Sequence, residues 1–468
     1  MDRIESQKVN VALDLPPEIV AYICVLHSAS STQDPDSPPP PPHTPLSLSH
    51  ICSTWRQSVI SDPRLWCSIS ITPPWNFNTI QLYLERSQTL PLTLDFSQIA
   101  HISEARRSDA VILFNLLQSH WTRCKSIRLH GRFGHNVGFV DKLMEEIVDK
   151  DMPLLQQLWV FGATSDDAQM DFPAAPNIFL SAPMLSDVRL GAAGFGRYRP
   201  PLSNVTNLEV GKSRTSSSFG YLMDLVQHCP KLESISMYGN VFLDQFLGPD
   251  GWHDPLAILP SVQTLRIFED IQLGLSLFSL IHLPNLRTFL FAPAAGNDIP
   301  RWSPDATPLT LDIGFSSVET LFLSPVRPES FMKVVPNAAG WFRHVKTLVL
   351  VTVYPDELLQ VFTEEEVNGG VIFPDLEHLV LNCVDELFLK PIRSLLDYRV
   401  EKGRVVKRLS VDSVSARYIG KEAMADLATS TSTVIDVCDL WEGVRANSMF
   451  GDDLYKFLGV PLCEVYQS

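Results

Sequence analysis

A short phrase of apolar residues returns ten times between residues 155 and 411, and it constrains the fold more than any other feature of the chain. The phrase reads apolar-x-x-apolar-x-apolar, from Leu155-Leu158-Val160 to Val406-Leu409-Val411. Nine steps lead from residue 155 to residue 406, or about 28 residues per step, a period typical of repeat architectures. The copies between begin at Leu185, Val205, Leu232, Val262, Leu286, Val318, Val345 and Leu376, and Cys124-Ile127-Leu129 is a plausible earlier copy.

Each copy has the pattern of one short strand. Alternate side chains of a strand point to opposite faces, so the last two apolar positions face a core and the residues around them face outward. Amphipathic stretches between copies, such as 219–226 and 356–362, predict helices. Strand and helix in repetition predict an α/β solenoid with a parallel sheet on its concave side. Chance occurrence in a Leu-rich chain is the alternative, and ten copies at a near-constant period argue against it.

The copies resemble leucine-rich repeats, although irregular ones. The asparagine expected at the turn after the strand occurs once, as Asn240. Two inserts, Gly191 to Pro201 and Pro293 to Pro308, are rich in Gly or Pro and interrupt the period. The resemblance implies a curved solenoid whose concave side binds another protein.

The first seventy residues have a different organisation, that of a small helical unit. Pro16-Pro17 suits the first turn of a helix, where a missing N–H costs nothing; Ile19, Ile23 and Leu26 follow at helical spacing. A second helix is predicted from Pro45 to about Ser61, and Asp62-Pro63 starts a last turn that carries Leu65 and Trp66. Between the helices, the proline-rich insert 34–45 is predicted to be an extended loop.

Three motif blocks of this unit resemble the F-box, in the form common in fungal proteins: Leu15-Pro16-Pro17-Glu18-Ile19, Cys52-Ser53-Thr54-Trp55-Arg56 and Asp62-Pro63-Arg64-Leu65-Trp66. The resemblance implies docking onto the Skp-type adaptor of cullin-RING ubiquitin ligases. Matching positions form or support the docking face, with a mixed core role for Trp55: Leu15, Pro16, Ile19, Trp55 and Trp66. The alternative is a generic helical cap on the repeat domain.

Composition narrows the possible partners and the compartment. A net charge of −16 without a basic cluster argues against nucleic acid as a partner. The eight cysteines are widely spread without a C-x-x-C pair, which favours free thiols in a reducing compartment. No apolar stretch is long enough to cross a bilayer, and the N-terminus does not read as a signal peptide. We expect a soluble intracellular protein, cytoplasmic or nuclear, without a membrane partner.

Motifs of catalysis were not found. The chain has no phosphate-binding loop, zinc-protease helix or nucleophile elbow, and Gly194-Phe195-Gly196 is followed by residues that cannot start a helix. The acidic run Glu364-Glu365-Glu366 is typical of a solvated face. We therefore expect neither an enzyme nor a cofactor or metal site.

The sequence thus predicts an α/β protein in four parts. These are a helical F-box-like domain (1–70) with its insert (34–45), a linking cap (71–120), an irregular leucine-rich-repeat solenoid (121–412), and a C-terminal cap and tail (413–468). The expected function is substrate recognition in an SCF-type ubiquitin ligase, with an adaptor and an unknown target protein as partners. The alternative is a non-degradative interaction scaffold, which target half-life after loss of the receptor separates from the first.

The target site is predicted on the concave face. Large aromatics and arginines carry binding energy at interfaces, and several flank the core-facing positions of the strands. The candidates are Trp159, Phe161, Arg189, Tyr238, Arg266, Phe268 and Phe322. Packing of these side chains beneath the insert loops or the C-terminal tail is the alternative.

Overall fold

A computed structural model covers the chain. It describes residues 15–30, 44–97, 107–134, 137–164, 177–191, 198–211, 225–238, 257–269, 281–293, 315–323, 342–351, 359, 362–363, 371–382, 386–431 and 433–438. Asn240, most of the two inserts 191–201 and 293–308, the acidic run 364–366, and residues 439–468 of the predicted tail lie outside these residues. Of the two inter-strand helices predicted, Leu225, Val226, Leu359 and Phe362 are described, and all four are buried.

Within the described residues, fourteen strands form one open parallel sheet in chain order. The strands are β1 (Ser68–Ser70), β2 (Leu92–Ser97), β3 (Cys124–Gly134), β4 (Gln157–Thr164), β5 (Asp187–Leu190), β6 (Asn207–Gly211), β7 (Ser234–Tyr238), β9 (Thr264–Glu269), β11 (Thr288–Pro293), β12 (Thr320–Leu323), β13 (Thr347–Val351), β14 (His378–Asn382), β15 (Arg408–Asp412) and β16 (Val434–Cys438). All eleven predicted copies, from Cys124 to Val411, coincide with strands β3 to β15. The mixed α/β class and the parallel sheet are confirmed.

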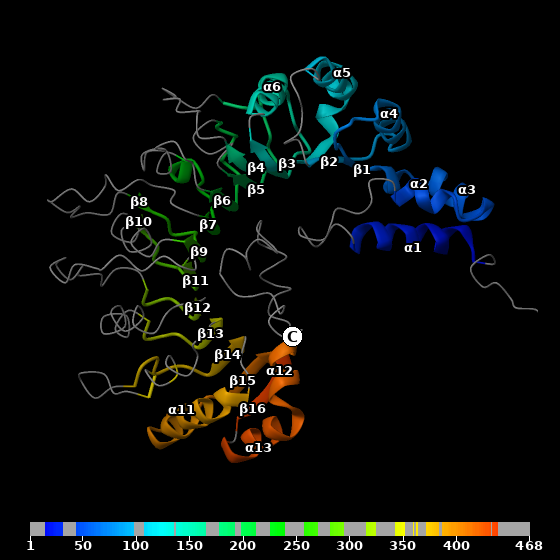
Figure 1. Cartoon of the computed structure of the whole chain (residues 1–468). Helices are drawn as coiled ribbons and strands as arrows, with labels where there is room; N and C mark the ends of the chain where they lie inside the picture. Colours follow the sequence, from blue (N-terminus) through cyan, green and yellow to red (C-terminus); the bar gives the residue numbers. More distant parts are fainter. Residues whose placement is uncertain are drawn as a thin grey trace, which may run out of the picture.

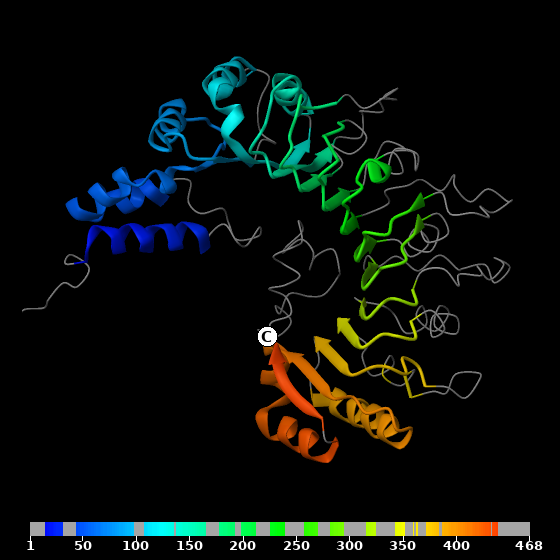
Figure 2. The same ribbon diagram turned by 180° about the vertical axis from the view of Figure 1, so that it is seen from behind.

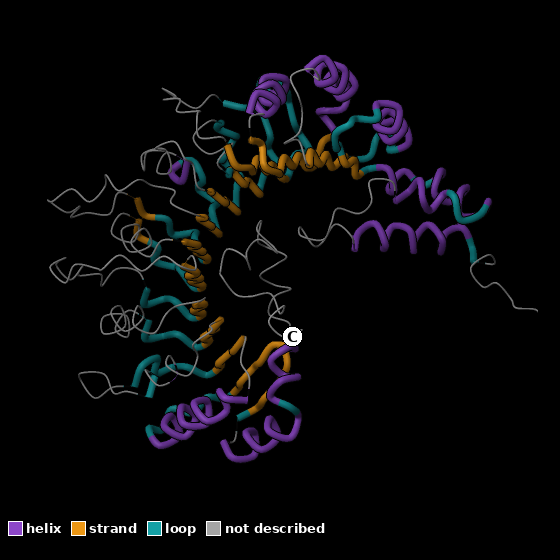
Figure 3. The backbone as a smooth tube through the Cα atoms, viewed as in Figure 1, coloured by secondary structure: helices purple, strands orange, loops and turns teal. Residues whose placement is uncertain are grey.

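The sheet follows an open arc, with its strands along the inner side (Figures 1 and 2). Helices α4 (Phe77–Arg86), α5 (Arg107–Leu117), α6 (Val137–Ile147) and α11 (Leu389–Glu401) lie on the outer side, as does a two-stranded sheet of β8 (Ala257–Ile258) and β10 (Ile281–His282) (Figure 3). Beside the sheet, the structure also has the 3-10 turns η5 (Gln118–Arg123) and η7 (Glu386–Phe388) and the helices α12 (Ser413–Ile419) and α13 (Lys421–Thr431). The sheet is longer than the predicted solenoid, because β1 and β2 precede residue 121 and β16 follows residue 412.

Apolar pairs on the outer-facing side of each strand build the core. In β4, Leu158 and Val160 are buried between the sheet and the segments outside it, and Trp159 between them faces the inner side. The same pair recurs in register on neighbouring strands, as Val188 and Leu190 on β5. A slip of one residue would turn these pairs to the inner face, so burial fixes the register of the whole sheet.

Backbone hydrogen bonds reinforce that register just before each strand. One carbonyl of a repeat accepts two consecutive N–H groups of the next: Gln156 accepts from Ser186 and Asp187, both at 3.0 Å. Thr206 does the same for Glu233 and Ser234, at 2.8 and 3.0 Å. These bonds satisfy backbone groups that burial would otherwise leave without partners.

The N-terminal helices continue the stack at the β1 end. They are α1 (Pro17–Ser30), α2 (Thr44–Ser49), α3 (Ser53–Ser61) and the turn η2 (Pro63–Trp66). The single helix predicted from Pro45 to Ser61 is two helices, because Cys52 adopts extended backbone and its Sγ accepts the N–H of Trp55 (3.5 Å), which starts α3. Thr44, predicted as loop, begins α2, and Pro45, predicted as the start of the helix, is its second residue; residues 34–43 of the insert lie outside the described residues.

Two arginine side chains link the outer layer to the sheet through hydrogen bonds to backbone carbonyls. Arg123 donates to the carbonyls of Leu84 (3.0 Å) and Leu90 (2.9 Å), which ties the α4 region to β3. Arg399 of α11 is fully buried and donates to the carbonyls of Ile372 and Phe373, both at 3.0 Å. Burial lowers the pKa of Arg399 to about 10, and no carboxylate among the described residues pairs with it. Within the described chain, the acceptors of its guanidinium group are backbone carbonyls.

Removing the hydrogen bonds of Arg399 should destabilise the C-terminal repeats. Arg399→Met leaves buried carbonyls without donors, and we expect a loss of about 3 kcal/mol and a melting temperature lower by several degrees. The matched control is Arg393→Met on the same helix, whose exposed ion pair with Asp426 is worth only about 0–1 kcal/mol. Equal melting temperatures for the two variants would contradict a stabilising role of the Arg399 hydrogen bonds.

Candidate binding surfaces

The residues between the core-facing positions form one row across the inner face. From β2 to β16 the row reads Asp95, Arg128, Trp159, Arg189, Glu209, Ser236, Arg266, Leu290, Phe322, Val349, Val380, Ser410 and Asp436, each in register with the next. We call it the concave row. Its first half is charged, its middle is apolar and its end is polar.

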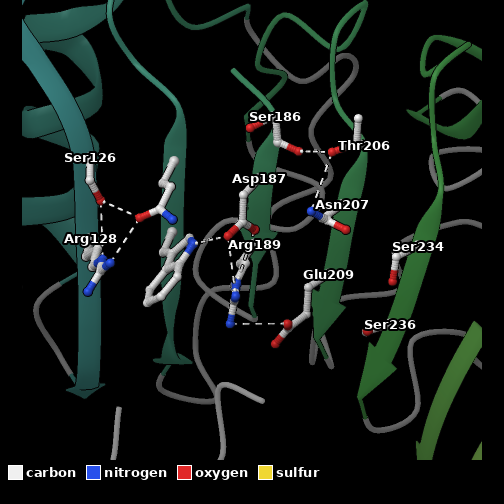
Figure 4. Close-up of polar contacts among 12 residues, drawn as sticks. Ser126, Arg128, Ser186, Asp187, Arg189, Thr206, Asn207, Glu209, Ser234 and Ser236 are labelled. Carbon is white, nitrogen blue, oxygen red and sulfur yellow. Dashed lines mark hydrogen bonds and ion pairs between the residues drawn. The ribbon is translucent and has the colours of Figure 1, made fainter. Parts of the chain in front are cut away.

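Trp159 is the centre of the charged half. The guanidinium groups of Arg128 and Arg189, on the two flanking strands, lie 4.1 and 4.0 Å from the centre of its ring. Its indole N–H donates to Asp187 (3.2 Å), and Arg128 donates to Gln157 (3.0 Å) and Ser126 (3.2 Å), as Figure 4 shows. Cation–π contacts of this kind are strongest where water is partly excluded. The partly exposed ring therefore lies between two cations.

Arg189 and Glu209 form a buried ion pair with unequal partners (Figure 4). Asp187 accepts both Nε (3.2 Å) and Nη2 (3.3 Å) of Arg189, so only Nη1 remains for Glu209, at 3.6 Å. Burial raises the pKa of Glu209 to about 8, against the opposing effect of Arg189. Burial acts to lower the pKa of Arg189, but the negative charges of Glu209 and Asp187 outweigh it, so that this pKa is raised. Burial thus outweighs the effect of Arg189 on Glu209, and this acid binds its proton more tightly than an exposed glutamic acid does.

Arg266 on β9 has a different environment from Arg189. Its Nη1 donates to the hydroxyl groups of Ser234 (2.9 Å) and Ser236 (3.4 Å), and no carboxylate of the described chain lies within ion-pair distance. Beside it, the rings of Tyr238 and Phe268 stack with centroids 4.3 Å apart. Burial lowers the pKa of Arg266. A cation therefore sits half-buried at the border between the charged and apolar parts of the row.

The predicted target-site residues divide into three groups. Trp159, Arg189 and Arg266 lie on the concave row and are partly exposed, as predicted. Tyr238, Phe268 and Phe322 lie on the same face but are buried, with 2, 2 and 7% of their surface exposed, as in the alternative in which these side chains are packed. Mutual stacking accounts for part of the burial of Tyr238 and Phe268. Phe161 is on β4, and its side chain lies outside the described residues.

The end of the row carries a second polar group. Asp436 on β16 accepts from Arg408 and from Ser410, and the Ser410 hydroxyl group also contacts His378 Nε2 at 2.7 Å. Burial acts in the opposite direction, yet the bonds from Ser410 and Arg408 lower the pKa of Asp436. Here Arg408 and Asp436 pair with each other, whereas Arg266 contacts no carboxylate of the described chain.

A second surface lies on α1, at the far N-terminal end. One stripe of this helix is apolar and exposed: Ile19 (46%), Tyr22 (55%), Ile23 (38%) and Leu26 (50%). The opposite side, Val20 and Cys24, is buried against the other helices. Exposing four large apolar side chains on one helix face to water is unfavourable compared with burying them, and exposed apolar patches of this kind mark binding sites.

The predicted adaptor residues fall on both sides of this unit. Ile19 belongs to the exposed stripe, Pro16 is exposed, and Leu15 and Trp55 are half-buried against the core. Trp66 is fully buried: its indole N–H donates to the Val59 carbonyl (2.9 Å) and its ring packs against Tyr83. Trp66 therefore supports the helical unit from inside and offers no contact surface in this structure.

Other kinds of site have little support in the described chain. No group of three or more His, Cys, Asp or Glu side chains there has the arrangement of a metal site. None of the described helices combines the length and the apolar character required to cross a bilayer.

Comparison with known proteins adds no relative. No protein-family model matches the chain, and no curated protein matches it.

The buried acid in the row should make stability depend on pH. Glu209 binds a proton in the folded state up to about pH 8 but is ionised above about pH 4.3 when unfolded. Stability from this group is complete below the lower value and decreases as pH rises through the higher one. Relative to wild type, Glu209→Gln should gain stability progressively between pH 5 and 9.

Melting temperatures of both proteins across that range provide the measurement. Glu319→Gln is the control, because this exposed acid pairs with Lys346 and its pKa is lowered instead. A constant difference between wild type and Glu209→Gln over the range would show that Glu209 is ionised in the folded state throughout.

Proposed function

We propose that the chain is the substrate-recognition subunit of an SCF-type, cullin-RING ubiquitin ligase. In this proposal the N-terminal helices bind the Skp-type adaptor and the concave face binds a target protein. The observation that carries the proposal is the exposed apolar stripe of α1, because it occurs within the segment whose three motif blocks resemble the F-box.

The arrangement of the two surfaces supports this division of roles. The stripe lies on α1, outside the sheet, whereas the charged half of the concave row lies on β2 to β9. Separate surfaces allow the chain to hold two proteins at once. The receptor then acts by proximity, since tethering raises the effective concentration of the target near the conjugating enzyme. No bond chemistry is required of the chain itself, so we propose no enzymatic activity.

Shortening the stripe should weaken the adaptor complex without unfolding the chain. The double substitution Ile19→Ala and Leu26→Ala removes half-exposed apolar groups and keeps the helix propensity of α1. Each loss is worth about 1 kcal/mol at an interface, so the dissociation constant for the recombinant Skp-type adaptor should rise about 30-fold. Isothermal titration calorimetry measures it.

Val111→Ala and Ile112→Ala on α5 are the matched control, since both side chains are about equally exposed, at 52 and 46%, and lie elsewhere. We expect the control to bind like wild type and both variants to melt within about 2 °C of it. Wild-type chain that does not bind the adaptor, or stripe variants that bind it unchanged, would overturn the proposal.

A further inference from the structure

The three arginines of the concave row use their guanidinium groups differently. A guanidinium presents Nε and Nη2 side by side, and this fork matches the two oxygens of a carboxylate. In Arg189 the fork is filled by Asp187. In Arg128 it donates to Ser126 and Gln157. In Arg266 only Nη1 is engaged, with Ser234 and Ser236, and the fork has no acceptor in the described chain.

An open fork at this position is energetically unusual. Arg266 is partly buried, and burial disfavours its charge enough to lower its pKa. A cation removed from water without a counter-ion is costly, so partners are normally present. The charge of Glu209 on β6 favours that of Arg266, but this buried acid contacts Nη1 of Arg189, at 3.6 Å, and burial raises its pKa. Among the described residues, the fork of Arg266 therefore has no counter-ion in contact.

The serines hold this cation in one orientation. Ser234 and Ser236 are on the neighbouring strand β7, and both accept from the same nitrogen, which fixes the plane of the guanidinium. The strand pairing places Ser236 directly opposite Arg266. A preorganised donor pair loses little conformational entropy when it binds.

We propose that the fork of Arg266 binds an anionic side chain of the target polypeptide, as a two-oxygen contact. This inference rests on the proposed function and names the chemistry of its target. The required group is an oxyanion with two oxygens toward the fork, supplied by Asp or Glu or by a phosphorylated residue. On the same row, the partly exposed Trp159 side chain between Arg128 and Arg189 offers a second contact.

A peptide selection on the immobilised full chain tests the inference. The probe is a displayed library of random 12-residue peptides, selected at pH 7 and low salt. We expect an acidic residue at one fixed position of the enriched peptides. A selection without that preference, or one whose peptides bind Arg266→Met as tightly as wild type, would overturn the proposal.

A double-mutant cycle then assigns the contact. Replacing the enriched Glu by Gln in a synthetic peptide should weaken binding to wild type by at least about tenfold, as expected for a charge-assisted pair. The same replacement should have no effect on Arg266→Met. A phosphoserine peptide in parallel identifies which oxyanion fits better. An equal loss from Glu to Gln on both proteins would place the contact elsewhere and overturn the inference.

Two further variants keep the test independent of folding. Arg266→Lys keeps the charge without the fork, so binding should be intermediate between wild type and Arg266→Met. Arg287→Met is the matched control, because Arg287 is exposed and lies just before β11, outside the row, and it should bind like wild type. Peptide binding by Arg266→Lys equal to wild type would rule out the two-oxygen contact.

Failure of this inference differs from failure of the proposed function. Adaptor binding should be equal for wild type and Arg266→Met, since α1 lies outside the sheet. A wild-type chain that binds the adaptor but shows no preference for acidic peptides overturns the inference alone. Selectivity for acidic peptides in a chain that does not bind the adaptor overturns the proposed function alone.

Discussion

The register between neighbouring strands is the constraint on which the structure depends. Paired apolar side chains such as Leu158 and Val160 must face the core, and a slip by one residue would expose both. Carbonyls that each accept two N–H groups of the next repeat hold the same alignment. Because the register is fixed, the residue between the apolar pair of every strand falls on one continuous row. A binding surface is thus generated by the same pattern that generates the core.

Along this row, charge is balanced locally rather than overall. Arg189 forms ion pairs with Asp187 and Glu209. Asp436 accepts hydrogen bonds from Arg408 and Ser410. Within the described chain, Arg266 donates to neutral hydroxyl groups instead of a carboxylate, which distinguishes it from Arg189 on the same face. The stripe on α1 depends on apolar contact instead. An apolar anchor and a charged capture site at different places suit a protein that holds two partners by different means.

Much of the fold could be predicted from the sequence, because core-facing apolar pairs repeat with strand periodicity. At the N-terminal end, the apolar residues from Ile69 to Phe96 indicate one more, atypical strand–helix unit, in the region where β1 and β2 lie. The pattern does not predict β16, because it fades after Val411. Position on the concave face was predictable for Trp159, Arg189 and Arg266, but the burial of Tyr238, Phe268 and Phe322 depends on packing that periodicity does not contain. Asp187 and Glu209 were overlooked, although Glu209 occupies the middle of its phrase. Likewise, the spacing of Ile19, Ile23 and Leu26 identified one helix face without showing that it is the exposed one.

The central claim is that adaptor and target occupy separate surfaces of one chain at the same time. Its most direct test is the affinity of a fluorescent acidic peptide from the selection for the full chain, measured by anisotropy with and without saturating adaptor. Independent surfaces predict dissociation constants equal within about twofold and a stable complex of all three components. Displacement of the peptide by the adaptor would contradict the account.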